Sequence, residues 1–362
     1  MKSGRKWRSV LFISVLFIFL NSTVKGNSFD RDSTATGLFE NDQILQISLI
    51  GNVVDLFSDR SGKAQEFPFT LVEEGSKETR LEHFLNIRTR GHYRRMEGNC
   101  KYPPLLLDFP RNEVPVVSVF HGQNKLKLVM PCQGDRYVFR EYLVYKLNNL
   151  LTPLSYRVRL VEVHFQDINN QKKNETVMGF LLEDSDQLAG RNGMTVVDQD
   201  LVRPDQIEVD NFLRVAIFQY LIGNTDWSVQ YRQNIRIFSD DQKRLKISPY
   251  DFDHSGLVRA PYAKPAPELK MASVMQRRFR GYCMHETQRF EDVLEEFRAT
   301  KQDFFRVLEQ AGYLDRGSSK YCKKYLEGFY KILNKQSKWT NAFTYPCREG
   351  GTGNVVIKGL KE

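Results

Sequence analysis

Short apolar runs separated by turn residues fill the first half of the chain. Between residues 44 and 72 these runs alternate with a polar turn at 59–62, a pattern that predicts β-hairpins. Similar runs follow, with Gly, Pro or Asn between them. We therefore expect a twisted antiparallel sheet in this half. Strands are predicted over residues 84–90, 104–109, 114–120, 125–130, 156–165 and 176–183.

Helical periodicity first appears over residues 136–151, and Pro153 ends this helix. Further helices are predicted over residues 205–222, 289–311 and 318–335, with two short strands at 234–239 and 245–247. A sheet-rich half and a helical half thus meet near residue 183, which predicts an α+β protein with two lobes. The predicted boundaries are 43–183 for the sheet-rich N-terminal lobe and 184–362 for the helical C-terminal lobe.

A secretory signal peptide is predicted over residues 1–26. Four basic residues precede an apolar run at 10–20, and Val24 and Gly26 supply the small side chains of a cleavage site after Gly26. The run is short for a membrane span, which needs about 20 residues. An uncleaved N-terminal anchor is the alternative. We expect residues 27–42 to form a flexible lead-in and the mature chain to be secreted or periplasmic, without a membrane span.

Composition narrows the class of protein only slightly. The net charge is +9, which suits an anionic ligand such as a nucleotide phosphate, but equally a solvated basic surface. No recognisable nucleic-acid-binding module accompanies it, so we expect no nucleic-acid partner. The five cysteines are widely spaced and contain no CxxC pair, which argues against zinc. The favoured disulfide joins Cys322 and Cys347. For Cys132 and Cys283, a buried unpaired thiol is as good an interpretation as a disulfide.

Polar residues with phosphotransfer chemistry follow the helix predicted at 205–222. Asp226 stands in a loop, Asn234 opens a strand eight residues later, and a hairpin leads to Asp251 and Asp253. Protein kinases use a loop Asp to position the acceptor hydroxyl, then an Asn and an Asp to hold the metal ions that bridge the phosphates. The order here is the same, although the spacing from Asp226 to Asn234 is longer and no HRD motif precedes Asp226.

Two other interpretations of these residues stay open. Asp and Asn are common in turns and caps, so each residue taken alone is as well explained by structure. A metal-dependent hydrolase would use Asp226, Asp251 and Asp253 around a metal, usually with histidines. Only six histidines occur in the chain, and His254 alone lies beside the acidic residues.

The segment NTDWSVQYRQNIRIF and the later KISPYDFDHSG resemble the spore-coat CotH-type kinases. Upstream, the Arg-Thr-Arg-Gly at 88–91 and the strand at 179–184 also resemble that family. The likeness covers roughly residues 85–256. It implies an atypical, bilobal protein-kinase-like fold, ATP with Mg²⁺ or Mn²⁺, and transfer to Ser or Thr side chains of exported proteins. A kinase-like binding module without activity is the main alternative.

Carried over by position, the resemblance makes Asp226 the catalytic Asp, and makes Asn234, Asp251 and Asp253 the metal-side residues. The chain also departs from the family. Gln233 stands where the family has His, and Tyr250 where it has Trp. The lysine-rich strand that follows Arg-x-Arg-Gly in the family is replaced by an apolar run at 100–107.

No single cation is therefore marked as the phosphate ligand. A phosphate clamp needs cations on a sheet that faces the cleft. Residues two apart on a strand face the same side, which groups the candidates in pairs. A glutamate early in the helix at 136–151 would pair with such a cation, as in kinases. Gly91 alone does not make a glycine-rich loop. The basic run at 276–281 is interpreted as a solvated loop, with an acidic-substrate or phosphate contact as the alternative. The nucleotide-site candidates are Arg88, Arg90, Lys125, Lys127, Glu141 and Glu183.

Overall fold

The computed structural model describes Met1 and residues 37–60, 62–74, 80–110, 113–282 and 287–343. The predicted signal peptide, Cys283 and Cys347 lie outside the described residues. The described part of the expected lead-in is held in place, because Leu38 is buried and its carbonyl accepts a hydrogen bond from Arg159 Nη1 (3.1 Å). Among the described helices, none combines the length and the apolar character that crossing a membrane requires.

Seven strands in the first half close into a barrel in the order β1-β2-β3-β4-β5-β7-β6. The ring closes because β1 (Leu45–Gly51) pairs parallel with β6 (Val158–Asp167), with Leu45 opposite Val161. Inward side chains such as Ile47, Leu71 and Leu126 are fully buried and form one core. The sequence predicted an antiparallel sheet. Closure joins residues more than a hundred positions apart, which strand periodicity does not reveal.

The remaining barrel strands match the predicted ones, with one exception. Residues 114–120, predicted as a strand, form turns, and Ser118 and His121 close two of them. The short apolar run there is buried at Val114 and Phe120 without pairing to a neighbouring strand. The other barrel strands are β2 (Phe67–Glu73), β3 (Leu81–Thr89), β4 (Leu105–Asp108), β5 (Lys125–Val129) and β7 (Glu175–Leu182).

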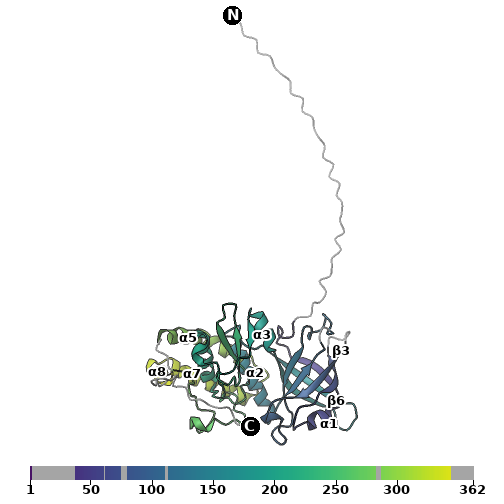
Figure 1. Cartoon of the computed structure of the whole chain (residues 1–362). Coiled ribbons are helices and arrows are strands. Elements are labelled where there is room, and N and C mark those ends of the chain that lie inside the picture. The colour runs from purple at the N-terminus through teal and green to yellow at the C-terminus, as the bar shows by residue number, and fades with distance from the viewer. Residues whose placement is uncertain (2–36, 61, 75–79, 111–112, 283–286, 344–362) are drawn as a thin grey trace. The chain divides into compact units, whose positions relative to one another are not determined.

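Helix α2 (Asp135–Asn149) joins the barrel to the helical half of the chain. It packs against β6 and β7 on one side and against α6 (Lys301–Glu309) and α7 (Arg316–Leu333) on the other (Figure 1). A second hydrophobic core, separate from the barrel interior, runs from α2 into the helical half. The chain is therefore a mixed α+β protein whose sheet-rich and helical parts meet at α2.

A small sheet of order β10-β9-β8 and helix α4 (Val209–Ile222) carry the loops of chemical interest. The predicted strands at 234–239 and 245–247 are confirmed as β9 (Ile235–Ser239) and β10 (Leu245–Pro249). Asn211 of α4 fixes β10, since its side chain both donates to and accepts from the Ile247 backbone (3.1 and 2.7 Å). The third strand, β8 (Thr195–Val197), was not predicted.

The predicted helix at 289–311 is two helices. The break falls at Thr300, whose hydroxyl donates to the carbonyl of Glu296 (2.8 Å), a bond that competes with regular helix geometry. The other helices are α1 (Val53–Ser58), α3 (Ser185–Arg191), α5 (Thr287–Ala299) and α8 (Gln336–Phe343), with 3₁₀ turns at Tyr93–Arg95, Pro204–Gln206 and Pro267–Leu269.

A disulfide joins Cys100 and Cys132. This pairing was not predicted, because the two residues are 32 positions apart and the fold alone brings them together. The bond ties the segment that follows β3 to the residues that precede α2. Cys322, expected to pair with Cys347, is instead a buried cysteine with a free thiol.

Loss of this disulfide should lower stability without abolishing the fold. For a loop of 32 residues, the restriction of the unfolded chain corresponds to about 3–4 kcal/mol. We expect Cys100→Ser/Cys132→Ser to lower the free energy of unfolding in a denaturant titration by that order. Reductant should destabilise the wild type by a similar amount and leave the double variant unchanged. An equal effect of reductant on both would show that the bond contributes nothing.

Candidate functional site

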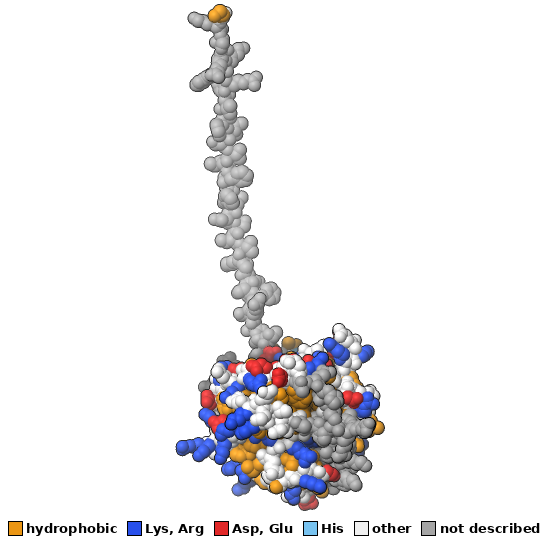
Figure 2. Space-filling model, turned by 90° about the vertical axis from the view of Figure 1, so that its left-hand side faces the viewer, with side chains coloured by type: hydrophobic (Ala, Val, Ile, Leu, Met, Phe, Trp, Pro, Cys, Tyr) orange, Lys and Arg blue, Asp and Glu red, His pale blue; other side chains and the backbone are white. Residues whose placement is uncertain are grey.

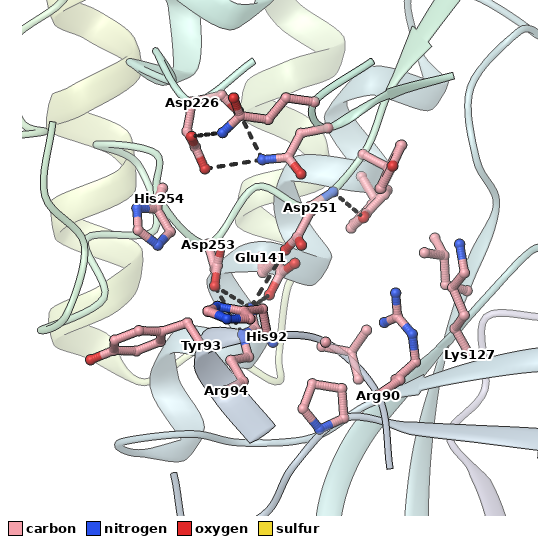
Figure 3. Close-up of a pocket in the computed structure, with 18 of the residues that line it drawn as sticks. Arg90, His92, Tyr93, Arg94, Lys127, Glu141, Asp226, Asp251, Asp253 and His254 are labelled. Carbon is pink, nitrogen blue, oxygen red and sulfur yellow. Dashed lines mark hydrogen bonds and ion pairs between the residues drawn. The ribbon is translucent and has the colours of Figure 1, made fainter. Parts of the chain in front are cut away.

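A cavity of about 360 Å³ lies where the barrel meets the loops after α4 and β10. Its walls come from the segment after β3, from β5, from α2, from the loop at 226–234 and from the segment at 250–254. Figure 3 shows Arg90 and Lys127 on one side of this space, with Asp226 and His254 on the other. The cavity therefore sets a basic wall opposite an acidic one.

The loop that carries Asp226 is fixed by its own backbone. Helix α4 ends at Gly223, whose φ of 69° suits glycine, and a Cβ there would overlap the Tyr325 hydroxyl. The Asn224 side chain accepts a hydrogen bond from the Asp226 amide (2.9 Å). Buried Arg280 donates to the carbonyls on either side of Asp226, those of Thr225 and Trp227. The position of Asp226 is thus set before any ligand binds.

Both carboxylate oxygens of Asp226 accept hydrogen bonds from side-chain amides. Gln233 Nε2 donates to Oδ1, and Asn234 Nδ2 donates to Oδ2 (3.0 Å) and to the Asp226 carbonyl (2.8 Å). Burial raises the pKa of Asp226, while His254 and the bond from Asn234 oppose the rise. The two amides orient the carboxylate, and its remaining lone pairs can accept a hydrogen bond from a further donor.

Asp251 opens into the cavity. Its backbone adopts a left-handed conformation with φ of 59°, and its amide donates to the Tyr145 hydroxyl (2.9 Å). This strained turn aims the side chain away from the β10 core, so that 46% of it is exposed. Burial by the cavity walls, with the charge of Asp253, raises the pKa of Asp251 to about 6.

Arg94 holds two buried carboxylates together. Its Nη2 lies 2.7 Å from Asp253 Oδ2 and 2.9 Å from Glu141 Oε2, and its Nε donates to the same Asp253 oxygen (2.9 Å). Tyr262 adds a hydrogen bond to Asp253 (2.9 Å). Burial raises the pKa of Glu141 despite Arg94, whereas for Asp253 the attraction of Arg94 outweighs burial and lowers the pKa. One guanidinium thus contacts two buried carboxyl groups whose pKa values move in opposite directions.

The basic wall consists of Arg90 and Lys127. Burial lowers the pKa of Lys127 to about 8, and the neighbouring charge of Arg90 contributes to the shift. Burial likewise lowers the pKa of Arg90. The Lys127 ammonium also lies 5.3 Å from the centre of the Tyr250 ring, an aromatic face that favours a cation. A polyanionic ligand would relieve this crowding of positive charge.

The cavity brings together seven of the ten predicted site residues. Those that line it are Arg90, Lys127, Glu141, Asp226, Asn234, Asp251 and Asp253. Three others do not line it. Arg88 lies two residues before Arg90 on β3, Lys125 is exposed and 3.8 Å from Asp108, and buried Glu183 is paired with Arg191 (2.7 Å).

Sequence reasoning missed Arg94, the partner of Glu141. The expectation was that a strand cation would make this pair. The Arg94–Arg95 doublet was the available signal. Its two side chains point in opposite directions, because Arg95 contacts Asp59 on the barrel side (2.7 Å) while Arg94 contacts the acidic segment.

The acidic wall suits a magnesium ion that keeps part of its water shell. The described residues contain no group of three His, Cys, Asp or Glu able to enclose a metal. Mg²⁺, however, typically takes only one or two carboxylates beside water and phosphate oxygens. Asp251 offers a partly exposed carboxylate, and Asn234, whose Nδ2 donates to Asp226, carries an amide oxygen of the kind that can act as a second hard ligand.

Comparison with known proteins bears on the same stretch. Residues 201–310 match the family model described as CotH kinase protein. A search of curated proteins found no match. The chain is also similar to the crystal structure of a Helicobacter pylori proinflammatory kinase, CtkA, at 11% identity, covering 64% of this chain and 91% of that one with a TM-score of 0.37. That score is too low to support an argument. The matched segment contains Asp226, Asn234, Asp251 and Asp253, so the predicted resemblance to the CotH-type kinases is confirmed over residues 201–310.

Proposed function

We propose that this chain is an exported, ATP- and magnesium-dependent kinase of the CotH type that phosphorylates Ser or Thr hydroxyls of exported proteins. The observation that carries the proposal is the cavity itself, in which oriented carboxylates face two crowded cations. Phosphoryl transfer depends on positioning and charge stabilisation, which this arrangement offers. The two-lobed kinase-like organisation, with lobes at 43–183 and 184–362, belongs to the same proposal.

Each wall would have its own task. Asp226, held by two amides, would accept the proton of the acceptor hydroxyl. Asp251 and the amide oxygen of Asn234 would hold magnesium, which supplies charge neutralisation between the phosphates when bound. Arg90 and Lys127 would contact the phosphates from the opposite side. Asp253 is occupied by Arg94 and Tyr262, and we assign it an orienting role.

Export is supported by the disulfide as well as by the N-terminal sequence. Disulfides persist in oxidising compartments and are rare in the cytosol. The Cys100–Cys132 bond therefore fits a secreted or periplasmic chain with a signal peptide at residues 1–26.

One feature favours the alternative of a kinase-like binding module. Gln233 stands where the family has His, and it contacts one of the two oxygens of Asp226. A site that binds nucleotide but transfers no phosphoryl group would show ligand binding without turnover, so binding and turnover need separate measurements.

Removal of the two open carboxylates should separate binding from chemistry. We expect Asp226→Asn to lower phosphotransfer by about 10²–10⁴-fold, because it loses the proton acceptor, while the thermal shift with ATP and Mg²⁺ persists. Asp251→Asn should lose the magnesium-dependent part of that shift. Asp241→Asn, in the exposed turn after β9, removes the same charge and should behave as wild type.

Two results would contradict the proposal. Turnover in Asp226→Asn equal to that of the wild type would refute catalysis at this site. If the melting temperature of the wild type does not change on addition of ATP with Mg²⁺ or Mn²⁺, the nucleotide site itself is refuted.

Nucleotide affinity should fall at alkaline pH because of Lys127. With its pKa at about 8, this ammonium is charged below that pH in the free protein and neutral above it. A bound polyphosphate stabilises the charged form, so the affinity is highest below pH 8 and weakens by up to about tenfold per unit above it. Isothermal titration calorimetry with nucleotide across this pH range measures the effect.

Two variants serve as controls. Lys127→Met should bind the nucleotide weakly and with little pH dependence, whereas Lys125→Met should keep the wild-type pH profile. Identical pH profiles for all three proteins would exclude Lys127 as a phosphate ligand.

Arg94 should matter for both stability and the site. Arg94→Met leaves two buried carboxylates without a cation, which is expected to cost about 3–5 kcal/mol in the free energy of unfolding. Arg94→Lys keeps the charge but loses the forked geometry, so we expect a milder loss of stability and weaker ATP binding. Arg95→Lys, on the barrel side, should lower stability while the ATP affinity of the folded protein stays unchanged. Equal ATP affinity in both lysine variants would show that Arg94 has no role in the site.

A further inference from the structure

Positive charge is concentrated in two segments of the helical half. Residues 254–282 and 316–343 together contain 13 Lys and Arg but only two acidic residues, Glu268 and Glu327. Their net charge of +11 exceeds the +9 of the whole chain, so all other residues together are slightly acidic. The basic character of the protein therefore belongs to one region and is not a general property of its surface.

The two segments pack against each other. The Tyr321 hydroxyl of α7 donates to the Gly256 carbonyl (2.6 Å), and Arg277 Nη2 donates to the Tyr325 carbonyl (2.6 Å). Arg259 lies 5.5 Å from the centre of the Tyr321 ring. Not every cation is free, because Arg277 and Arg280 of the basic run at 276–281 turn inward to backbone carbonyls. The exposed cations that remain therefore lie on two segments that pack against each other.

We define the basic face by six exposed cations from both segments. Among the described residues, none of the six has an acidic partner within ion-pair distance. Elsewhere exposed cations are often neutralised, as in the pairs Lys101–Glu175 and Arg244–Asp240. The left and lower edges of the view in Figure 2, taken from the side on which α7 and α8 lie in Figure 1, show projecting Lys and Arg side chains. The six residues are Arg259, Lys264, Lys270, Lys320, Lys324 and Lys331.

One of the two segments of the basic face also contributes to the cavity. His254 lines the cavity and is the first residue of the segment that leads to Arg259. Further along the same segment, the Tyr262 hydroxyl contacts Asp253, which lines the cavity (2.9 Å). A chain that placed a hydroxyl at Asp226 would therefore lie beside the segment that contributes Arg259 to the basic face.

The chemistry of the face favours an acidic polypeptide over other anions. Insertion into a membrane needs apolar side chains beside the charges, but Leu326, Phe329 and Leu333 of α7 are buried. Stacking of single-stranded nucleic acid needs exposed aromatic rings, and Met275 is the one large apolar side chain exposed among the described residues of the two segments. Carboxylates of a peptide require only the cations.

We propose that the basic face docks an acidic stretch of the polypeptide acceptor, so that Ser or Thr residues flanked by Asp and Glu are the preferred substrates. The docking surface stands on its own observations, whereas its link to an acceptor hydroxyl rests on the proposed phosphotransfer function. The interaction is largely electrostatic, and added salt should weaken it.

The test measures binding apart from catalysis. A short fluorescein-labelled peptide with one Ser between blocks of Glu is titrated by fluorescence anisotropy without nucleotide, against the same peptide with Gln in place of Glu. We expect the Glu peptide to bind at least about tenfold more tightly, and Lys320→Glu/Lys324→Glu to lose that preference. Lys173→Glu/Lys243→Glu changes the net charge equally at exposed sites on two distant turns and should bind like wild type.

The outcomes separate the two proposals. Equal binding by both double variants, or tighter binding of duplex DNA or phosphatidylserine vesicles that only the α7 variant loses, would overturn the docking inference. If Asp226→Asn still binds the Glu peptide, that result supports the docking inference whether or not turnover occurs. Binding of the Glu peptide by an enzyme that phosphorylates other acceptors but never this peptide would overturn the role of the face in acceptor recognition, whereas peptide binding without phosphotransfer to any acceptor would refute the kinase function alone.

Discussion

The contact of Arg94 with Asp253 and Glu141 is the interaction on which the site depends. It joins three separate parts of the chain, namely the segment after β3, helix α2 and the segment after β10. In protein kinases a lysine on a strand pairs with the helix glutamate, whereas here an arginine outside the barrel strands does so. A guanidinium presents several donors in a fixed fork, so it can contact two carboxylates where a lysine would serve as a single point charge. The disulfide between Cys100 and Cys132 restrains the same segment a few residues further on.

This arrangement also determines how charge is distributed within the cavity. Because Arg94 stabilises Asp253 as an anion, the next carboxylate along, Asp251, experiences both burial and a negative neighbour, and its pKa rises. On the other wall, Arg90 and Lys127 repel each other, and the pKa of Lys127 falls. Each wall is thus held in an electrostatically unfavourable state that a complementary ligand would relieve. A cation between Asp251 and Asn234, with polyanionic phosphates beside Arg90 and Lys127, would do so on both sides at once.

The acidic half of the site could be predicted from sequence, whereas the basic half could be predicted only in part. Asp226, Asn234, Asp251 and Asp253 lie within one short stretch whose loop, strand and hairpin follow from local pattern, so their convergence needs little tertiary information. Arg90 and Lys127 were among the candidates, but nothing local separated them from Arg88 and Lys125. Position along the strand decides between them, because the cavity is lined by Arg90, which follows the last residue of β3, and by Lys127 of β5, but not by Arg88 or Lys125. Arg94 was missed because it lies in a turn, and its partners are 47 and 159 residues away.

Barrel closure bears on the apolar residues of β4, where the resemblance to the CotH-type kinases implied a lysine-rich strand. Strand β4 pairs with β3 on one side and β5 on the other, and its three leucines are buried on both faces of the sheet. A lysine in place of Leu105 or Leu107 would put an unpaired ammonium in the barrel core, at a cost of several kcal/mol. The barrel core therefore requires apolar side chains at these two positions. Arg90, after the last residue of β3, and Lys127, whose neighbours Leu126 and Leu128 face the core, avoid this cost, and both line the cavity.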